Sequence, residues 1–442
     1  MAKPFVMLVM FVFCLYVSAA FAGNYKVIKP ESVGLSTERL ERLTNLIDEH
    51  VEEKKIAGSV ILIARQGKIA YFKETGLADT GKPMKKDTIF RIVSMTKPIT
   101  STAIMLLYEE GKLLLSDPMS KYIPEFKNQR VIEMLPNGSS SEYKLVPVER
   151  EVTIHDMLTH QSGILYMAST GWFPNPKREQ VISFYREAGI TDGFCRPDES
   201  IGDMVKRLAK LPLYTQPGEA WEYSLSLDVL GYLVEVISSM PFDEFVQTQI
   251  FDPLKMTDSH FYIPEDKLSR LAADWETDWN GKLTRVNGPL ISGDLALCPD
   301  NAYETEGKYL SGGASVLSTA YDYSRFAQMF LNQGELDGVR LLSRKTVELM
   351  TATNHIGDHY ADLLHSEGWK FGLGFAIQQD RSKGVDSGDV GVYEWAGYYS
   401  TRFSVNPKEE TVTIFLSQTS PFDAHFNMWD KVISLSTTAI ID

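Results

Sequence analysis

The chain has 442 residues, of which 44% are hydrophobic, and its formal net charge at pH 7 is −14. This length suffices for one large domain or two ordinary ones, with a sizeable hydrophobic core. An acidic chain lacks the basic surface that binds nucleic acid, and it is equally disfavoured at an anionic membrane surface. Composition therefore excludes these two kinds of partner.

Residues 1–22 have the pattern of a secretory signal peptide. Lys3 supplies a positive charge, an apolar run extends from Phe5 to Ala20, and an A-x-A end falls at Ala22. The run is short for a membrane span, and no stop-transfer pattern follows it. We therefore predict export to the periplasm or the medium, cleavage near Ala22, one mature domain of residues 23–442 and no stable membrane insertion afterwards.

The chain has three cysteines. Cys14 would leave with the signal peptide, so that Cys195 and Cys298 remain. In an oxidising compartment these two could pair, and two free buried thiols are the alternative. The spacing of the two residues leaves both possibilities open.

Secondary-structure signals are clearest near the two ends of the chain. Residues 37–54 carry apolar residues at helical spacing, and "SVILIARQGKIAYFKETG" predicts a β-hairpin that turns at Gln66-Gly67. Near the end, "GVYEWAGYYSTRFSVNPKEETVTIFLSQ" predicts three strands, broken at residues 399–400 and 406–408. A final amphipathic helix is expected within residues 423–441.

Strands at the two ends of a chain usually meet in one sheet. We therefore predict an α+β fold: an antiparallel sheet flanked by helices, with a mostly helical region inserted across residues 100–300. Long irregular loops are expected in this region, among them "MLPNGSSSEYKLVPVER". The functional site is expected between the sheet and the inserted region.

The stretch "IFRIVSMTKPITSTAIMLLYEEGK" places Ser94 three residues before Lys97, where an apolar helix begins. Residues at this spacing share a helix face, so the amine can reach the hydroxyl. A lysine sequestered there would have a lowered pKa and could accept the serine proton, while free N–H groups at the helix start would stabilise an oxyanion. The alternative is that both side chains are simply solvent-exposed.

The pattern Ser-x-x-Lys alone is a weak signal. A second match, at residues 141–144, lies in the polar loop and precedes no apolar helix. We interpret this second match as coincidental, because the chemistry needs the helix start that only Ser94 has.

A second candidate is Tyr223, at the end of a loop in "QPGEAWEYSLSLDVLGYLVEVI". Its phenol would enter the cleft beside Ser94, ionise more easily near an ammonium group, and act as a general base or acid. The alternative is that Ser224 or Ser226 caps the helix that follows and the motif has no catalytic role.

A third candidate is the strand "EWAGYYSTRF". Gly397 would let the backbone approach a ligand closely, and the Tyr398 N–H would be a second oxyanion donor. An ordinary strand with a buried Trp395 is the alternative.

Other chemistries have little support. The chain contains no G-x-S-x-G or H-E-x-x-H motif and no phosphate-loop motif G-x-x-x-x-G-K-[ST]. Its one histidine cluster, "HIGDHYADLLH", lies in a polar segment with glycine, which indicates a surface loop rather than a metal site. We therefore expect no metal and no organic cofactor.

Taken in order, these segments resemble the serine β-lactamase and penicillin-binding-protein superfamily, and most closely the class C β-lactamases and family VIII carboxylesterases. The resemblance covers Leu35 to Ser434. It is carried by "FRIVSMTKPITSTAIMLLYEEGKLLLSDPMSKYIPEF", "VTIHDMLTHQSGI", "YTQPGEAWEYSLSLDVLGYLVE", "IFDPLKMTDSHF", "YLSGGASVLSTAYDYSRFAQMFL" and "FGLGF". It implies the β-lactamase/transpeptidase-like fold.

The resemblance also implies roles for individual residues. Ser94 would be the acylated nucleophile, Lys97 its proton partner, and Tyr223 the tyrosine that acts in acylation and deacylation. The third family motif falls on Trp395-Ala396-Gly397, and the N–H groups of Ser94 and Tyr398 would hold the oxyanion. His160, in the "LTHQSG" turn, is interpreted as structural.

Two departures from the β-lactamase pattern bear on the substrate. The tyrosine motif ends in Leu225 instead of asparagine, and the third motif begins with Trp395 instead of the lysine that holds a β-lactam carboxylate. Tryptophan at this position is similar to the esterase branch, so we predict an exported serine hydrolase that cleaves uncharged carboxylic esters through an acyl-enzyme.

Several alternatives share the same machinery. They are β-lactam hydrolysis, hydrolysis of D-amino-acid peptides, and acyl transfer to an acceptor other than water. A penicillin-binding or sensor protein that is acylated once and does not turn over is a different class. In each case the expected partner is a small-molecule ester or amide, and the sequence makes no prediction of oligomeric state.

Overall fold

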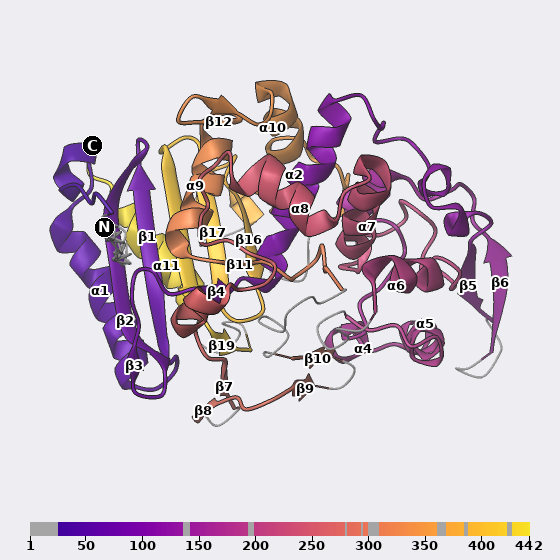
Figure 1. Cartoon of the computed structure of the whole chain (residues 1–442), viewed down its shortest axis with the longest axis horizontal. Helices are drawn as coiled ribbons and strands as arrows, with labels where there is room; N and C mark the ends of the chain where they lie inside the picture. The colour runs from indigo at the N-terminus through magenta and orange to yellow at the C-terminus, as the bar shows by residue number, and fades with distance from the viewer. Residues whose placement is uncertain are drawn as a thin grey trace, which may run out of the picture.

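The computed structural model describes residues 25–135, 142–192, 199–278, 281–292, 295–298, 309–359, 368–383, 388–421 and 427–442. These residues form a sheet with helices on both faces and a mostly helical region beside it (Figure 1). The predicted signal peptide, residues 1–22, lies outside the described residues. Within the described ranges, no helix is both long and apolar enough to cross a membrane.

The central feature is an eight-stranded sheet in the spatial order β14-β15-β16-β17-β18-β1-β2-β3. Its strands are β1 (Gly58–Arg65), β2 (Lys68–Asp79), β3 (Lys82–Pro83), β14 (Trp369–Phe371), β15 (Ala376–Gln378), β16 (Tyr393–Gly397), β17 (Thr401–Asn406) and β18 (Thr411–Ser417). Neighbouring strands run antiparallel, and β1 pairs with β18 so that Leu62 lies opposite Ile414. The two ends of the chain therefore meet in one sheet, as predicted.

Strand β1 lies between two hydrophobic clusters. Its even-numbered residues from Val60 to Ala64 point into one cluster, and Ile61 and Ile63 point into the other, because successive side chains alternate across a strand. All eight of its positions are buried. The chain turns into β2 at Gln66 and Gly67, with φ angles of 54° and 71°. Two consecutive left-handed residues are typical of a type I′ hairpin turn, which confirms the predicted hairpin.

Helices cover both faces of the sheet. Helices α1 (Thr37–Glu52) and α11 (Met428–Thr438) pack against the face that carries Ile61 and Ile63. Helices α2 (Thr96–Glu109) and α9 (Ala320–Leu331) belong to the larger cluster on the opposite face, where α9 lies over the strands (Figure 1). The architecture confirms the predicted α+β, β-lactamase/transpeptidase-like fold.

The inserted region is mostly helical, as predicted, but it is more ordered than expected. It contains α3 (Ile154–Leu158), α5 (Pro176–Glu187), α6 (Ile201–Leu208) and α7 (Ser226–Ser238). The segment predicted as an irregular loop, residues 134–150, instead contains the strand β6 (Tyr143–Pro147), which pairs antiparallel with β5 (Arg130–Met134) just before it. A backbone hydrogen bond of 3.1 Å from Ile132 N to Leu213 O anchors this hairpin, and such a long-range contact is not visible in the local sequence.

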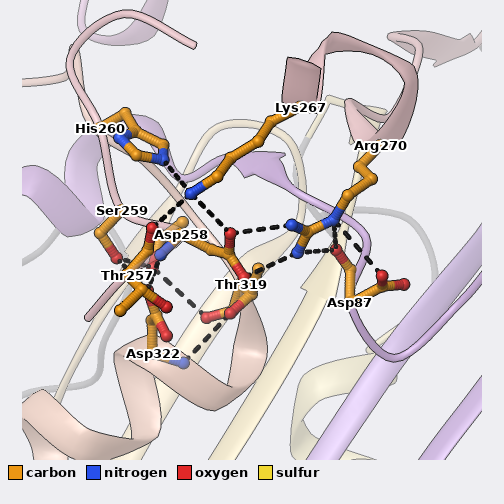
Figure 2. A network of polar contacts seen from close by, with 10 residues as sticks. Asp87, Thr257, Asp258, Ser259, His260, Lys267, Arg270, Thr319 and Asp322 are labelled. Atoms are coloured by element: carbon orange, nitrogen blue, oxygen red, sulfur yellow. Dashed lines mark hydrogen bonds and ion pairs between the residues drawn. The ribbon is translucent and has the colours of Figure 1, made fainter. Parts of the chain in front are cut away.

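A network of charged side chains fixes the start of α9 (Figure 2). Arg270 donates two hydrogen bonds of 2.8 Å to the carboxylate of Asp258 and others to the carbonyl of Asp87. Asp322, in the first turn of α9, accepts hydrogen bonds from Asp258 N at 2.7 Å and Ser259 Oγ at 3.0 Å. Burial raises the pKa of Asp322 to about 7.

Candidate active site

Ser94 lies in a tight turn that leads directly into α2. The turn comprises Val93–Met95 and is a 3₁₀ helix. Val93 has a φ of 46°, in the left-handed region that β-branched residues rarely adopt. Such a conformation costs about 1–3 kcal/mol and persists only where surrounding structure enforces it. Here Ile92 N donates to Val316 O at 3.1 Å, and Ile92 O accepts from Thr401 Oγ1 at 3.2 Å.

Lys97 lies in the first turn of α2 and points at the serine. Its Nζ atom is 3.1 Å from Ser94 Oγ and 2.9 Å from Gly313 O, and the residue is only 1% exposed. Burial lowers the pKa of Lys97 to about 7, against the opposing influence of the carboxylates of Asp228 and Asp192. The lysine can therefore be neutral, and act as a base, near neutral pH.

Tyr223 joins this pair from the inserted region. Lys97 Nζ lies 4.7 Å from the centroid of the Tyr223 ring, and the tyrosine is 8% exposed. Burial raises the pKa of Tyr223, and hydrogen bonds with Ser94 and Trp395 only partly oppose this effect. The expectation that the phenol ionises more easily is therefore wrong: loss of hydration outweighs the attraction of an amine that is itself held near neutrality. Tyr223 is better suited to donating a proton.

The strand predicted to complete the site is β16. Trp395 is 1% exposed, and its ring lies 5.6 Å from that of Tyr223 and 5.3 Å from that of Phe371. Gly397 is needed for close approach, but to protein rather than to ligand: an added Cβ would collide with Ile92 O and Thr401 Oγ1. Tyr398 is half-buried at the end of this strand. The structure thus brings β16 against the turn that carries Ser94.

Sequence reasoning missed two buried acids near Lys97. Asp228 Oδ1 accepts a 2.5 Å hydrogen bond from Ser311 Oγ, and burial raises the pKa of Asp228 to about 6. Asp192 Oδ1 accepts from Met167 N at 2.9 Å, and burial raises its pKa to about 7. A carboxylate in the apolar helix "LDVLGYLVEVI" was a usable signal for Asp228. No comparable signal marks Asp192, which follows a loop.

The histidines behave differently from one another. His160 is fully buried, with its ring 4.9 Å from that of Tyr223. His355, predicted to lie in a surface loop, is instead half-buried, and its Nδ1 lies 3.0 Å from His155 Nε2. That contact joins residues 200 positions apart, so local composition does not reveal it. His359 is exposed, and His365 lies outside the described residues.

The remaining reactive groups are possible metal ligands and the cysteines. Among the described residues, no group of three or more His, Cys, Asp or Glu side chains is placed to hold a metal ion. Cys298 is disulfide-bonded, which removes the free-thiol alternative for this residue. Cys14 and Cys195 lie outside the described residues.

Comparisons with known proteins agree with this architecture. The model of the family described as Beta-lactamase matches residues 43–436. Esterase EstB of Burkholderia gladioli is 31% identical over 388 residues, which cover 86% of this chain and 90% of EstB. The solved structure of EstCE1, described as a hydrolase with promiscuous acyltransferase activity, has a TM-score of 0.76 and 25% identity, and the match covers 90% of this chain and 98% of EstCE1.

A further likeness concerns the fold alone. Simvastatin synthase (LovD) from Aspergillus terreus has a TM-score of 0.72 at 21% identity, and the match covers 91% of this chain and 98% of that one.

Fold and relatives together define a class: a serine hydrolase related to β-lactamases and penicillin-binding proteins, with esterase-like activity and small-molecule substrates. The chain belongs to the Beta-lactamase family.

Proposed function

We propose that this chain is an exported carboxylesterase that forms an acyl-enzyme on Ser94. The observation that carries the proposal is the 3.1 Å approach of the buried Lys97 Nζ to Ser94 Oγ. A buried amine with a pKa of about 7 is neutral in a large fraction of molecules at neutral pH, so it can accept the serine proton.

The reaction follows from the positions of three side chains. Lys97 takes the hydroxyl proton as Ser94 Oγ attacks the ester carbonyl, and the backbone N–H groups of Ser94 and Tyr398 hold the oxyanion that forms. As the tetrahedral intermediate collapses, the C–O bond to the alcohol breaks, Tyr223 delivers a proton to the departing oxygen, and the proton that Lys97 took from Ser94 replaces it on Tyr223. Water then attacks the acyl-enzyme, and the same groups work in reverse order to release the acid.

An uncharged ester is the substrate class that this site favours. Trp395 stands where a β-lactamase has a lysine, and it is packed against Tyr223 and Phe371 rather than offering a cation to a carboxylate. The esterase relative supports the same preference. This weighs against β-lactams and D-amino-acid peptides, both of which carry a carboxylate.

Acyl transfer is the second candidate, favoured by one observation. EstCE1 is described as a hydrolase with promiscuous acyltransferase activity, and its fold matches 90% of this chain. Transfer requires only that an alcohol or amine reaches the acyl-enzyme before water does. Product analysis in the presence of an added alcohol detects it directly.

The test compares a short-chain p-nitrophenyl ester with a chromogenic cephalosporin, each incubated with wild type and Ser94→Ala. We expect fast ester cleavage, little cephalosporin cleavage, and loss of both in the variant. Cephalosporin cleavage as fast as ester cleavage would reject the ester preference. Substantial ester cleavage by Ser94→Ala would reject the mechanism. A stable adduct without turnover would instead identify a penicillin-binding or sensor protein.

Export is a separate part of the proposal. A disulfide at Cys298 is a feature of proteins that fold in oxidising compartments, and residues 1–22 have the signal pattern. The test is N-terminal sequencing of the protein recovered outside the cytoplasm, which should begin at or near Gly23. Protein that stays in the cytoplasm with Met1 intact would reject export.

A further inference from the structure

The two chain neighbours of Tyr223 are each held by a specific side-chain contact from another part of the inserted region. Glu222 is bound on one side and Ser224 on the other, so that the tyrosine lies between two fixed points. Glu222 carries a charge that is mostly covered by protein.

Arg178, on α5, holds Glu222 through a two-pronged ion pair. Arg178 Nη1 donates to Glu222 Oε2 at 2.9 Å, and Nη2 donates to Oε1 at 3.2 Å. The two side chains are 6% and 16% exposed. The guanidinium also lies 4.7 Å from the centroid of the Tyr214 ring, so packing restricts its rotation. A planar, bidentate pair of this kind fixes direction as well as distance.

His160 holds Ser224 through a chain of buried hydroxyls. His160 Nδ1 lies 3.0 Å from Ser224 Oγ, which is 2.8 Å from Ser226 Oγ, which in turn is 2.8 Å from Ser162 Oγ. Burial lowers the pKa of His160 well below its usual value, so the ring is neutral and its Nδ1 can accept a hydrogen bond from the Ser224 hydroxyl. The backbone is joined at the same place, since Glu222 N donates to His160 O at 2.8 Å.

These contacts replace the helix cap that the sequence suggested as an alternative. Helix α7 begins at Ser226 with Leu225 as its N-cap residue, and no side chain caps it. The hydroxyls of Ser224 and Ser226 are instead committed to His160 and to Ser162. Serines that served only to cap the helix would instead bond to the free backbone N–H groups of its first turn.

We propose that Arg178 and His160 are positioning residues, which aim the Tyr223 phenol at the reacting ester by clamping Glu222 and Ser224. The proposal rests on the proposed function of Tyr223 as the group that protonates the leaving alcohol. It makes the geometry of that proton transfer dependent on α5 of the inserted region. Neither residue touches the substrate in this account.

The experiment measures how strongly turnover depends on the leaving group. A p-nitrophenolate leaves without help, whereas an alkoxide needs a proton, so the ratio of alkyl-ester to p-nitrophenyl-ester turnover reports proton delivery. Tyr223→Phe removes the phenol hydroxyl and so gives the turnover ratio expected when proton delivery is lost completely. Arg178→Met and Ser224→Ala should each lower kcat for the alkyl ester about 10- to 100-fold, as expected when a reacting group is slightly misplaced, with a much smaller loss on the p-nitrophenyl ester.

A matched control variant separates a change in the position of the Tyr223 phenol from a general loss of stability. Arg65 is also a buried arginine paired with acids, at 7% exposure, but it binds Glu409 and Asp442 beside the chain end that lies at the far left of Figure 1. Arg65→Met should lower the melting temperature and leave the turnover ratio unchanged. Arg178→Lys, which keeps the charge and loses the fork, should recover part of the ratio.

The outcomes distinguish a failure of the proposed role of Tyr223 from a failure of the positioning roles of Arg178 and His160. If Tyr223→Phe leaves the ratio unchanged, the proposed function of Tyr223 fails. If Tyr223→Phe lowers the ratio while Arg178→Met and Ser224→Ala do not, the positioning proposal fails. If Arg178→Met does not fold, the turnover ratio of Ser224→Ala tests the positioning proposal, because this variant removes one hydroxyl and leaves the ion pair between Arg178 and Glu222 intact.

Discussion

Lys97 Nζ lies 3.1 Å from Ser94 Oγ and 2.9 Å from Gly313 O, and the lysine is only 1% exposed. Gly313 is also where two other groups converge, because a Cβ added there would lie 2.6 Å from Asp228 Oδ2 and 2.9 Å from Tyr166 OH. The amine is therefore held between a hydroxyl, a carbonyl and a nearby carboxylate, and its protonation state depends on all three.

The first prediction concerns pH. Since burial lowers the pKa of Lys97 to about 7, the neutral, reactive amine is lost as pH falls below that value. We expect kcat/KM for a p-nitrophenyl ester to decline on the acid side of about pH 7. The negative charge of Asp228 raises the lysine pKa, so Asp228→Asn should move this decline to lower pH. A decline that stays in place, or moves upward, would contradict the assignment of Lys97 as the base.

The second prediction concerns Gly397. An alanine Cβ would collide with the backbone oxygen of Ile92, which belongs to the segment that carries Ser94, so β16 must shift. We expect Gly397→Ala to lower kcat about 100-fold through displacement of the oxyanion donors. Gly171→Ala is the matched control, because its added Cβ meets no atom of the described residues within 4 Å, apart from its own chain neighbours. Equal activity of the two variants would contradict the close-approach argument.

The third prediction concerns Trp395. Its near-complete burial means that Trp395→Lys would place an unpaired ammonium among aromatic rings instead of offering it to a substrate. We expect the free energy of unfolding to fall by about 3–5 kcal/mol, with no gain in cephalosporin cleavage. Trp395→Phe, which keeps an apolar ring, should lose far less stability. Denaturant unfolding and the cephalosporin assay together check this, and efficient cephalosporin turnover would show that position 395 faces the substrate.

The fourth prediction concerns the network of Figure 2. Burial raises the pKa of Asp322 to about 7, so the folded state keeps a proton that the unfolded chain has already released, and stability falls as pH rises toward that value. Asp322→Asn stays neutral and can still accept from Asp258 N and Ser259 Oγ. Its free energy of unfolding should therefore change less between pH 6 and 8 than that of wild type.

A neighbouring histidine, His260, also makes the free energy of unfolding depend on pH. His260, whose pKa burial lowers to about 4, has the opposite trend: its contribution to stability is lost only as pH falls below the ordinary histidine range. Because His260 is present in both proteins, the difference between their free energies of unfolding at each pH isolates Asp322. Identical pH dependence in the two proteins would contradict the raised pKa.

Local patterns predicted five of the eight strands of the sheet, namely β1, β2, β16, β17 and β18. The turn at Gln66-Gly67 and the breaks between β16, β17 and β18 are encoded by a few adjacent residues, and the structure has them where the sequence indicates. The approach of Lys97 to Ser94 was also predictable, because three positions on one helix turn fix it.

Contacts between distant segments were not predictable in the same way. The acids Asp228 and Asp192 reach the neighbourhood of Lys97 from separate elements, and the pairing of β5 with β6 depends on an anchor at Leu213. The direction of the Tyr223 pKa was mistaken for a related reason. Sequence shows which charges could be near the phenol, whereas the extent of its burial is a property of the packed molecule.

Covalent labelling tests directly whether Ser94 is the nucleophile. The enzyme is treated with a p-nitrophenyl alkylphosphonate, which leaves a stable phosphonyl group on an attacking serine, and then examined by intact-mass and peptide mass spectrometry. We expect one adduct, on the peptide that contains Ser94, which is absent in Ser94→Ala and retained in Ser141→Ala, the variant of the second Ser-x-x-Lys match. An adduct on any other residue, or one that persists in Ser94→Ala, would contradict this role of Ser94.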